Sequence, residues 1–213
     1  MGRIYDATWG RGFAALYDSF FKSVEEAGLR DMRRELVGQA SGRTIDIGSG
    51  TGANLELYPA DVDLVMAEPD PHMARQLRTK LAESRRDAEF VQAGAESLPF
   101  DDASFDTAVF TLVLCTVPNP RAALAEVARV LKPGGKMLFL EHVRAQSQGL
   151  ARWQDRLEKP WRFVGDGCHC NRDTVGTIES SPLRLQHVER DKLPKAPPIT
   201  QPLARGSAVR AAA

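Results

Sequence analysis

This sequence of 213 residues has few cysteines, no long apolar run and no excess of positive or negative charge. Its three cysteines are an odd number, which argues against a disulfide framework and favours a reducing compartment. No apolar run approaches about 18 residues, so no membrane-spanning helix is expected. Lysine plus arginine equals aspartate plus glutamate, 28 each, and this balance argues against nucleic acid or an anionic membrane as the main partner.

The N-terminal segment MGRIYDATWGRGFAALYDSF has no apolar stretch followed by a small-residue cleavage site, so we expect no secretory signal and a cytoplasmic protein. Hydrophobic residues make up 43% of the chain and charged residues 26%, as in an ordinary globular protein. We therefore expect a single domain that works as a monomer or a homodimer.

Apolar patterning predicts alternating strands and helices. Strands are expected at residues 43–47, 62–67, 89–92, 105–114, 136–142, 183–190 and 203–210. Helices are expected within 12–37, at 72–85, and from Asn119-Pro120 onward, where an N-cap residue precedes a proline. This alternation is typical of an open α/β fold, a doubly wound, mostly parallel sheet with helices on both faces.

The segment TIDIGSGTGANLELYP at 44–59 places three glycines, Gly48, Gly50 and Gly52, directly after a predicted strand. Glycines allow a sharp turn and a close approach of backbone to a ligand, and we expect a helix to begin at 54–57, behind this loop. Both a dinucleotide and S-adenosylmethionine use such a loop, and both carry a ribose that Glu68 would bind. The spacing with Asp46 fits the second ligand better but does not exclude the first.

Further segments resemble a known family. AESLPFDDASFDTAVF (95–110), RVLKPGGKMLFLEHV (129–143) and the glycine loop together resemble class I S-adenosylmethionine-dependent methyltransferases of the ubiquinone/menaquinone type. GTGANLELYP, EPDPHM, TLVLCTVPNPRAALAEVARVLKPGG, LEHV and GDGC are similar to the thiol S-methyltransferases, over about residues 33–188. The resemblance implies a Rossmann-like sheet of seven strands in the order 3-2-1-4-5-7-6. It also implies a helical cap at 1–40, a cofactor-binding core at 41–143 and an acceptor-side segment at 144–213.

The same resemblance implies S-adenosylmethionine as the cofactor, S-adenosylhomocysteine as the product, and roles for individual residues. The three glycines and Asp46 would hold the methionine part, Glu68 would take both ribose hydroxyls, and Pro69 and Met73 would flank the adenine. The remaining cofactor-binding residues would be Gly94, Ala95 and Glu96 at the adenine, Thr111 and Leu112 at the methionine part, and Tyr17 as a cover.

The sequence indicates the residues of the acceptor side less specifically than those of the cofactor side. His142 ends a predicted strand and is the first candidate for a base or a substrate contact, and Asp166 or His169 would activate a thiol. Cys168, His169 and Cys170 are close in sequence, but their spacing is not a usual structural zinc pattern, so we expect no metal.

We therefore expect methyl transfer to a small, lipophilic acceptor, most simply a thiol, with quinone-like phenols and phospholipid amines as alternatives. A nicotinamide-dependent oxidoreductase and a protein that binds the cofactor without turnover are more distant alternatives.

Overall fold

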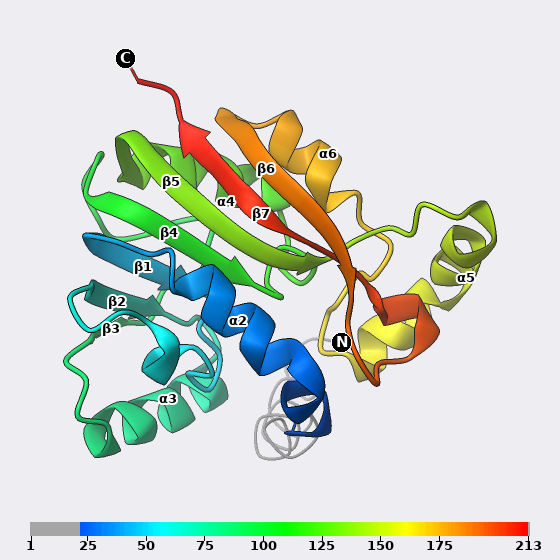
Figure 1. The fold of residues 1–213 in the computed structure, drawn as a ribbon, viewed down its shortest axis with the longest axis horizontal. Helices are drawn as coiled ribbons and strands as arrows, with labels where there is room; N and C mark the ends of the chain where they lie inside the picture. The colour runs from blue at the N-terminus through cyan, green and yellow to red at the C-terminus, as the bar shows by residue number, and fades with distance from the viewer. Residues whose placement is uncertain (1–21, 213) are drawn as a thin grey trace.

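A single seven-stranded sheet organises the chain in the computed structural model, which describes residues 22–212 (Figure 1). The strand order is β3-β2-β1-β4-β5-β7-β6, as predicted. Neighbouring strands from β3 to β5 are parallel, and β7 runs antiparallel to both β5 and β6. The strands are β1 (Arg43–Ile47), β2 (Asp63–Ala67), β3 (Glu89–Val91), β4 (Phe105–Thr111), β5 (Leu131–His142), β6 (Leu183–Lys192) and β7 (Pro202–Arg210).

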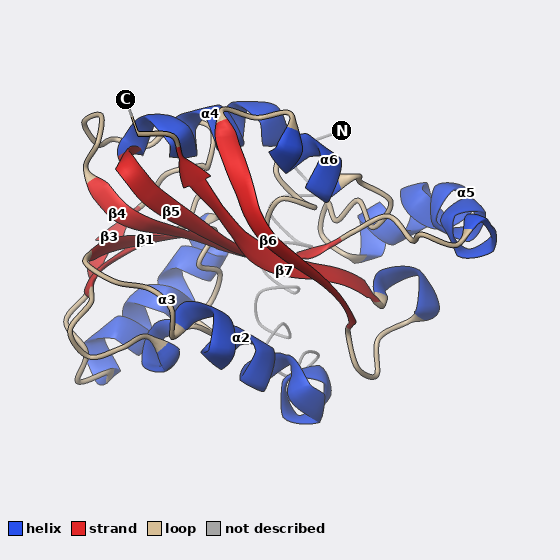
Figure 2. Ribbon diagram, turned by 45° about the horizontal axis from the view of Figure 1, so that its top comes forward, coloured by secondary structure: helices blue, strands red, loops and turns tan. Residues whose placement is uncertain are grey.

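Helices cover both faces of this sheet. Figure 2 shows α4 (Pro120–Val130) and α6 (Thr174–Glu179) on one face, with α2 (Arg30–Val37) and α3 (Pro71–Glu83) on the other. The longest helix, α5 (Gln148–Val164), lies past the end of β5, to the side of both layers. A π-helical turn, η1 (Glu25–Leu29), precedes α2, and two short 3-10 turns are η2 (Leu55–Leu57) and η3 (Pro198–Thr200).

The two faces of the sheet bury separate apolar cores. Because side chains alternate along a strand, Ile45 and Ile47 point into the core beneath α4 and α6. Val109, Leu138 and Leu140 point into the core beneath α2 and α3. Strand β4 is buried along most of its length, which is why its largely apolar sequence predicted it. Strand β1 is buried too, but it alternates Ile45 and Ile47 with the buried polar residues Thr44 and Asp46.

Two of the helices begin as their sequences indicate. The Asn119 side chain accepts a hydrogen bond from the N–H of Ala122, and Asp70 accepts from His72 and Met73, at 2.8–3.1 Å. Each cap is followed by a proline at the first helical position, where the missing N–H costs nothing. The prediction for α4 is confirmed, and α3 begins one residue before the predicted start.

Several expectations about the elements were wrong. No α-helix follows the glycine loop: η2 spans three residues, and the chain then becomes extended at Tyr58, the residue before a proline. Strand β4 ends at Thr111 rather than at residue 114, because Leu112 adopts a left-handed conformation with φ 62°. Strand β5 starts at Leu131, five residues early, and neither α5 nor α6 was predicted.

Part of the first predicted helix, residues 12–21, lies outside the described residues, as does Tyr17. Within residues 22–212, no helix combines the length and the apolar character needed to cross a bilayer.

Gly206 tests the packing of the central antiparallel strands. It lies in β7 opposite Phe139 of β5, and an added Cβ would overlap the carbonyl oxygen of His187 and approach the Phe139 ring at 3.0 Å. We expect Gly206→Ala to lower the free energy of unfolding by about 1–3 kcal/mol, the usual effect of overpacking.

The control is Gly149→Ala on α5, where an added Cβ meets no atom within 4 Å. This change should raise helix stability by about 0.5–1 kcal/mol. Denaturant unfolding followed by circular dichroism measures both variants. Equal stability of the two proteins would contradict the packing at Gly206.

Candidate functional site

The glycine loop that follows β1 has left-handed backbone at all three glycines, with φ values of 68° at Gly48, 56° at Gly50 and 81° at Gly52. Their surroundings differ. A Cβ on Gly48 would lie 2.7 Å from the Val113 side chain, and one on Gly52 would lie 2.8 Å from Leu77. A Cβ on Gly50 would meet no atom within 4 Å. Gly48 and Gly52 are therefore required by packing, while Gly50 borders open space.

Glu68 joins this loop to the end of the second strand. One carboxylate oxygen accepts a hydrogen bond from the N–H of Gly50 and the other accepts from the N–H of Asp70, both at 2.8 Å. The side chain is buried, and this burial raises the pKa of Glu68 to about 7 even though both backbone donors favour the ionised form. Each oxygen retains a lone pair, so the carboxylate can accept two further hydrogen bonds, as a ribose diol requires.

Asn54 is the centre of a buried network beneath the loop. Its amide nitrogen donates to Asp46 at 3.0 Å and to the Thr111 hydroxyl at 2.9 Å, and its amide oxygen accepts from Arg33 at 3.2 Å. Burial raises the pKa of Asp46 to about 6, and the Asn54 hydrogen bond lowers it. Asp46 thus braces the loop through Asn54, and its predicted contact with the methionine part of the cofactor stays a prediction. Asn54 was not predicted, because in this region only the glycines and the acids Asp46 and Glu68 indicate ligand binding by their spacing.

The predicted adenine side is assembled from two loops. Pro69 is exposed and Met73 is buried at the start of α3, both directly after Glu68. Ala95 is buried, and a Cβ on Gly94 would lie 3.5 Å from a Glu96 oxygen.

The other oxygen of Glu96 accepts the N–H of Asn119 at 3.0 Å. Glu96 therefore ties the turn after β3 to the start of α4 and leaves one carboxylate oxygen for a ligand.

On the acceptor side, Glu141 fixes the loop that follows β4. It is buried near the end of β5, and its carboxylate accepts the N–H of Val113 at 2.9 Å and of Cys115 at 3.3 Å. Burial raises the pKa of Glu141 to about 7, while backbone N–H groups of Leu114 and Val113 lower it. The left-handed Leu112 turns the chain into this loop, a conformation that costs an L-residue about 1 kcal/mol. Thr111 and Leu112 therefore lie where the donor and acceptor sides meet.

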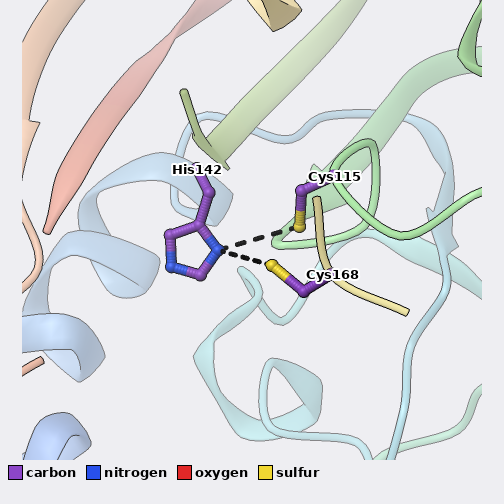
Figure 3. Close-up of side chains that lie close together, drawn as sticks. All are labelled: Cys115, His142 and Cys168. Carbon is purple, nitrogen blue, oxygen red and sulfur yellow. Dashed lines mark hydrogen bonds between the residues drawn. The ribbon is translucent and has the colours of Figure 1, made fainter. Parts of the chain in front are cut away.

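His142, the last residue of β5, lies beside two cysteines from other segments (Figure 3). Its Nδ1 is 3.7 Å from Cys115 Sγ and 3.5 Å from Cys168 Sγ, and all three side chains are buried. The spacing along the chain gave no indication of this group. In the sequence, Cys168 suggests a metal site only together with its neighbours His169 and Cys170. The structure instead places it beside Cys115 and His142.

The two other predicted acceptor-side residues lie in the loop after α5. The His169 ring pairs with Glu158 through Nδ1 at 2.8 Å, and its backbone N–H donates to the carbonyl of Cys115. Burial, with the nearby Arg172 cation, lowers the pKa of His169. Asp166 is half-buried and left-handed, with φ 48°. The structure thus gives His169 a partner on α5 and does not assign either residue to the reaction.

The geometry fits a ligand with a diol and an amino-acid tail. Gly50 borders open space, and the Glu68 carboxylate one hydrogen bond away has acceptor capacity for two hydroxyls. Both groups lie at the carboxyl ends of β1 and β2, beside the position where the strand order reverses between β1 and β4. Open α/β sheets bind their ligands at this position.

Comparisons with known proteins agree with this geometry. The model of a family described as "Methyltransferase domain" matches residues 45–139. A thiol S-methyltransferase from Homo sapiens, TMT1B, is 36% identical over 178 residues, which is 78% of this chain and 73% of that protein. The TMT1B protein from Rattus norvegicus is 41% identical over 141 residues, 64% of this chain and 58% of the relative. The chain thus spans between about half and three quarters of the length of these relatives.

A solved structure of an S-adenosylmethionine-dependent methyltransferase from Thermotoga maritima has the same fold. It superposes with a TM-score of 0.67 at 20% identity and covers 94% of this chain and 97% of its own. The chain belongs to the class I S-adenosylmethionine-dependent methyltransferases, in the group that includes the thiol S-methyltransferases.

Gly50 provides a direct test of the loop. Gly50→Ala would place a methyl group in the open space, so we expect the affinity for S-adenosylhomocysteine to fall at least about tenfold, or about 1.4 kcal/mol. The left-handed backbone should also lower the free energy of unfolding by about 1–2 kcal/mol.

Gly134→Ala is the matched control, because Gly134 has φ 77° and equally open surroundings but lies near the start of β5, away from the glycine loop. It should lose the same stability and keep its affinity, as titration calorimetry would show. A similar affinity loss in both variants would remove Gly50 from the binding site.

Proposed function

We propose that this protein transfers the methyl group of S-adenosylmethionine to the sulfur of a small, lipophilic thiol. The likeness to the thiol S-methyltransferases carries the choice of acceptor, because it extends beyond the donor-binding core into the segment that includes Cys168. The arrangement of Gly50 and Glu68 supports the choice of donor. We further propose that the protein is a monomer or a homodimer, acts in the cytoplasm and needs no nucleic acid.

Donor binding would use groups that are already fixed. Glu68 would accept the two ribose hydroxyls, Gly50 would admit the methionine part, and Met73 and Pro69 would flank the adenine. Asp46 and Thr111 are immobilised by Asn54, so the loop needs little rearrangement when the donor binds. The bound donor supplies an activated methyl group on a sulfonium. The chain therefore has to provide position and to exclude water rather than a strong acid or base.

The acceptor would approach from the loop after β4 and the end of β5. A thiol suits this region, because thiols ionise near neutral pH with modest help, whereas a phenol needs a stronger base. His142 is the last residue of β5, and its Nδ1 already contacts two sulfur atoms. We propose that His142 contacts the acceptor, and that Asp166 and His169 help to cover it.

A screen of three acceptor classes tests the choice of substrate. Labelled donor is incubated with an alkyl thiol, a quinone-like phenol and an ethanolamine lipid at equal concentration. We expect the thiol to be methylated fastest, with label recovered in a thioether. Faster transfer to the phenol or the amine would overturn the thiol assignment while leaving the methyltransferase assignment in place. Tight binding of NAD(H) without binding of S-adenosylhomocysteine would overturn both.

The raised pKa of Glu68 predicts how donor affinity changes with pH. In the free protein this pKa is about 7, and the ribose hydroxyls need the ionised carboxylate. Below pH 7 the carboxylate must first lose its proton, so affinity falls as pH falls. We expect S-adenosylhomocysteine to bind roughly tenfold more weakly at pH 6 than at pH 8.

Glu68→Gln is the companion variant. It should bind more weakly at pH 8 and lose most of this pH dependence, because the amide does not titrate in this range. Calorimetry at both pH values measures the effect. An unchanged pH dependence in the variant would assign the titration to another group.

A further inference from the structure

Two cysteine sulfur atoms and one histidine nitrogen, all atoms that bind metal ions, lie close together at the carboxyl ends of β4 and β5. Cys115 lies in the loop after β4, His142 ends β5, and Cys168 lies in the loop after α5 (Figure 3). Their ligand atoms all lie within 4.8 Å of one another. The side chains are only 1%, 6% and 6% exposed, so water does not separate them.

Both sulfur atoms approach the same ring nitrogen. The two sulfur atoms both face Nδ1 of His142, at 3.7 Å from Cys115 and 3.5 Å from Cys168. A ring nitrogen has either one lone pair or one hydrogen, so it makes one such bond. The other sulfur must then bond elsewhere, and Cys115 Sγ also lies 3.6 Å from the Thr116 hydroxyl.

A tetrahedral zinc ion accounts for both contacts. Zinc–sulfur bonds of about 2.3 Å and zinc–nitrogen bonds of about 2.0–2.1 Å, at a tetrahedral angle, put sulfur and nitrogen about 3.6 Å apart. The two observed distances lie on either side of this value. Thiolate and imidazole are also the ligands that favour zinc over magnesium or calcium. Within residues 22–212, no fourth histidine, cysteine, aspartate or glutamate belongs to the group. Three protein ligands with an open position are typical of zinc sites that bind a substrate.

The backbone around the three ligands is held by further contacts. Cys115 donates its N–H to Glu141 and accepts from the N–H of His169 at 2.8 Å. The guanidinium of Arg172 donates to the carbonyls of Leu114 and Val117, on both sides of Cys115, at 2.7 Å. These bonds fix the position of Cys115, as outer contacts do for metal ligands.

His142 is held in the same way, because its carbonyl accepts from the Thr174 hydroxyl at 3.1 Å. Its Nε2 is buried and has no hydrogen-bond partner among the described residues. With Nδ1 bound to a metal, Nε2 carries the hydrogen and has that N–H to offer to an acceptor.

We propose that Cys115, His142 and Cys168 form a zinc site whose open position binds the thiol acceptor. This inference rests on the proposed function. The site is next to the donor site, since Thr111 pairs in register with Leu140, two residues before His142. The acceptor loses its thiol proton to solvent when its sulfur binds the metal. The sulfur then forms a bond to the methyl carbon as the bond from that carbon to the sulfonium breaks, which leaves S-adenosylhomocysteine. The neutral thioether binds zinc weakly and departs.

The first experiment measures metal content. The full chain, purified without a histidine tag and dialysed against Zn²⁺, is analysed by elemental mass spectrometry. We expect about one zinc ion per chain. Cys115→Ser and Cys168→Ser should each lose at least half of it, whereas Cys170→Ser should keep it. Cys170 is the matched control because it is also buried but lies outside the group.

The second experiment replaces zinc by cobalt, which reports its ligands by absorption. Thiolate-to-cobalt charge-transfer bands should appear in the wild-type protein, and an added alkyl thiol, but not the matching alcohol, should change them. Wild-type protein without bound zinc would overturn the site, as would a metal-free Cys115–Cys168 disulfide or equal metal loss in the Cys170 variant. Thiol methylation without zinc would reject the metal and retain the proposed function. Bound zinc with no response of the cobalt bands to thiol would reject the acceptor role.

Discussion

The carboxylate of Glu68 holds together the two loops that form the proposed donor site. Its two oxygens accept one backbone N–H from the glycine loop and one from the start of α3, segments that follow different strands. Burial of a carboxylate is costly, and these two charge-assisted hydrogen bonds offset part of that cost. Because the carboxylate is held at both oxygens before any ligand arrives, it presents its remaining lone pairs in a fixed direction. A fixed acceptor of this kind suits a vicinal diol.

The donor and acceptor sides are joined by side chains from the middle of the sheet. Asn54 links the glycine loop to Thr111 at the end of β4, and Glu141 links β5 to the loop that carries Cys115. Since β4 and β5 are in register at Thr111 and Leu140, these two links lie side by side. The fold thus places the proposed acceptor loop beside the proposed donor site, and the left-handed Leu112 lies between them.

Much of the fold could be predicted from local patterns. The apolar run of β4, the N-cap and following proline of α4, and the glycines of the loop are all local signals. The resemblance supplied the strand order. The missed features depend on tertiary contacts. Helix α5 contains Pro160, which argues against a helix in the sequence, and its residues Trp153, Leu157, Phe163 and Val164 are each more than a third exposed. The expected helix after the glycine loop is prevented by Gly52 and by the extended Tyr58.

The site residues that the sequence indicated and those that it did not differ in the same respect. Glu68 and Gly50 could be proposed from the sequence because a ribose diol needs a carboxylate and a closely bound ligand needs a bare backbone, and their contact with the donor stays a prediction. Asn54, Glu141 and Arg172 were missed because each forms hydrogen bonds with residues more than 25 positions away in the sequence. Asn54 also bonds Asp46, on the other side of the glycine loop. Cys115, His142 and Cys168 come from three segments that only the folded sheet brings together.

The most direct measurement is a crystal structure of the full chain with S-adenosylhomocysteine. The account predicts both ribose hydroxyls within hydrogen-bond distance of the Glu68 carboxylate, with the amino-acid tail lying over Gly50. Adenosine bound at another edge of the sheet, or a ribose that makes no contact with Glu68, would contradict it.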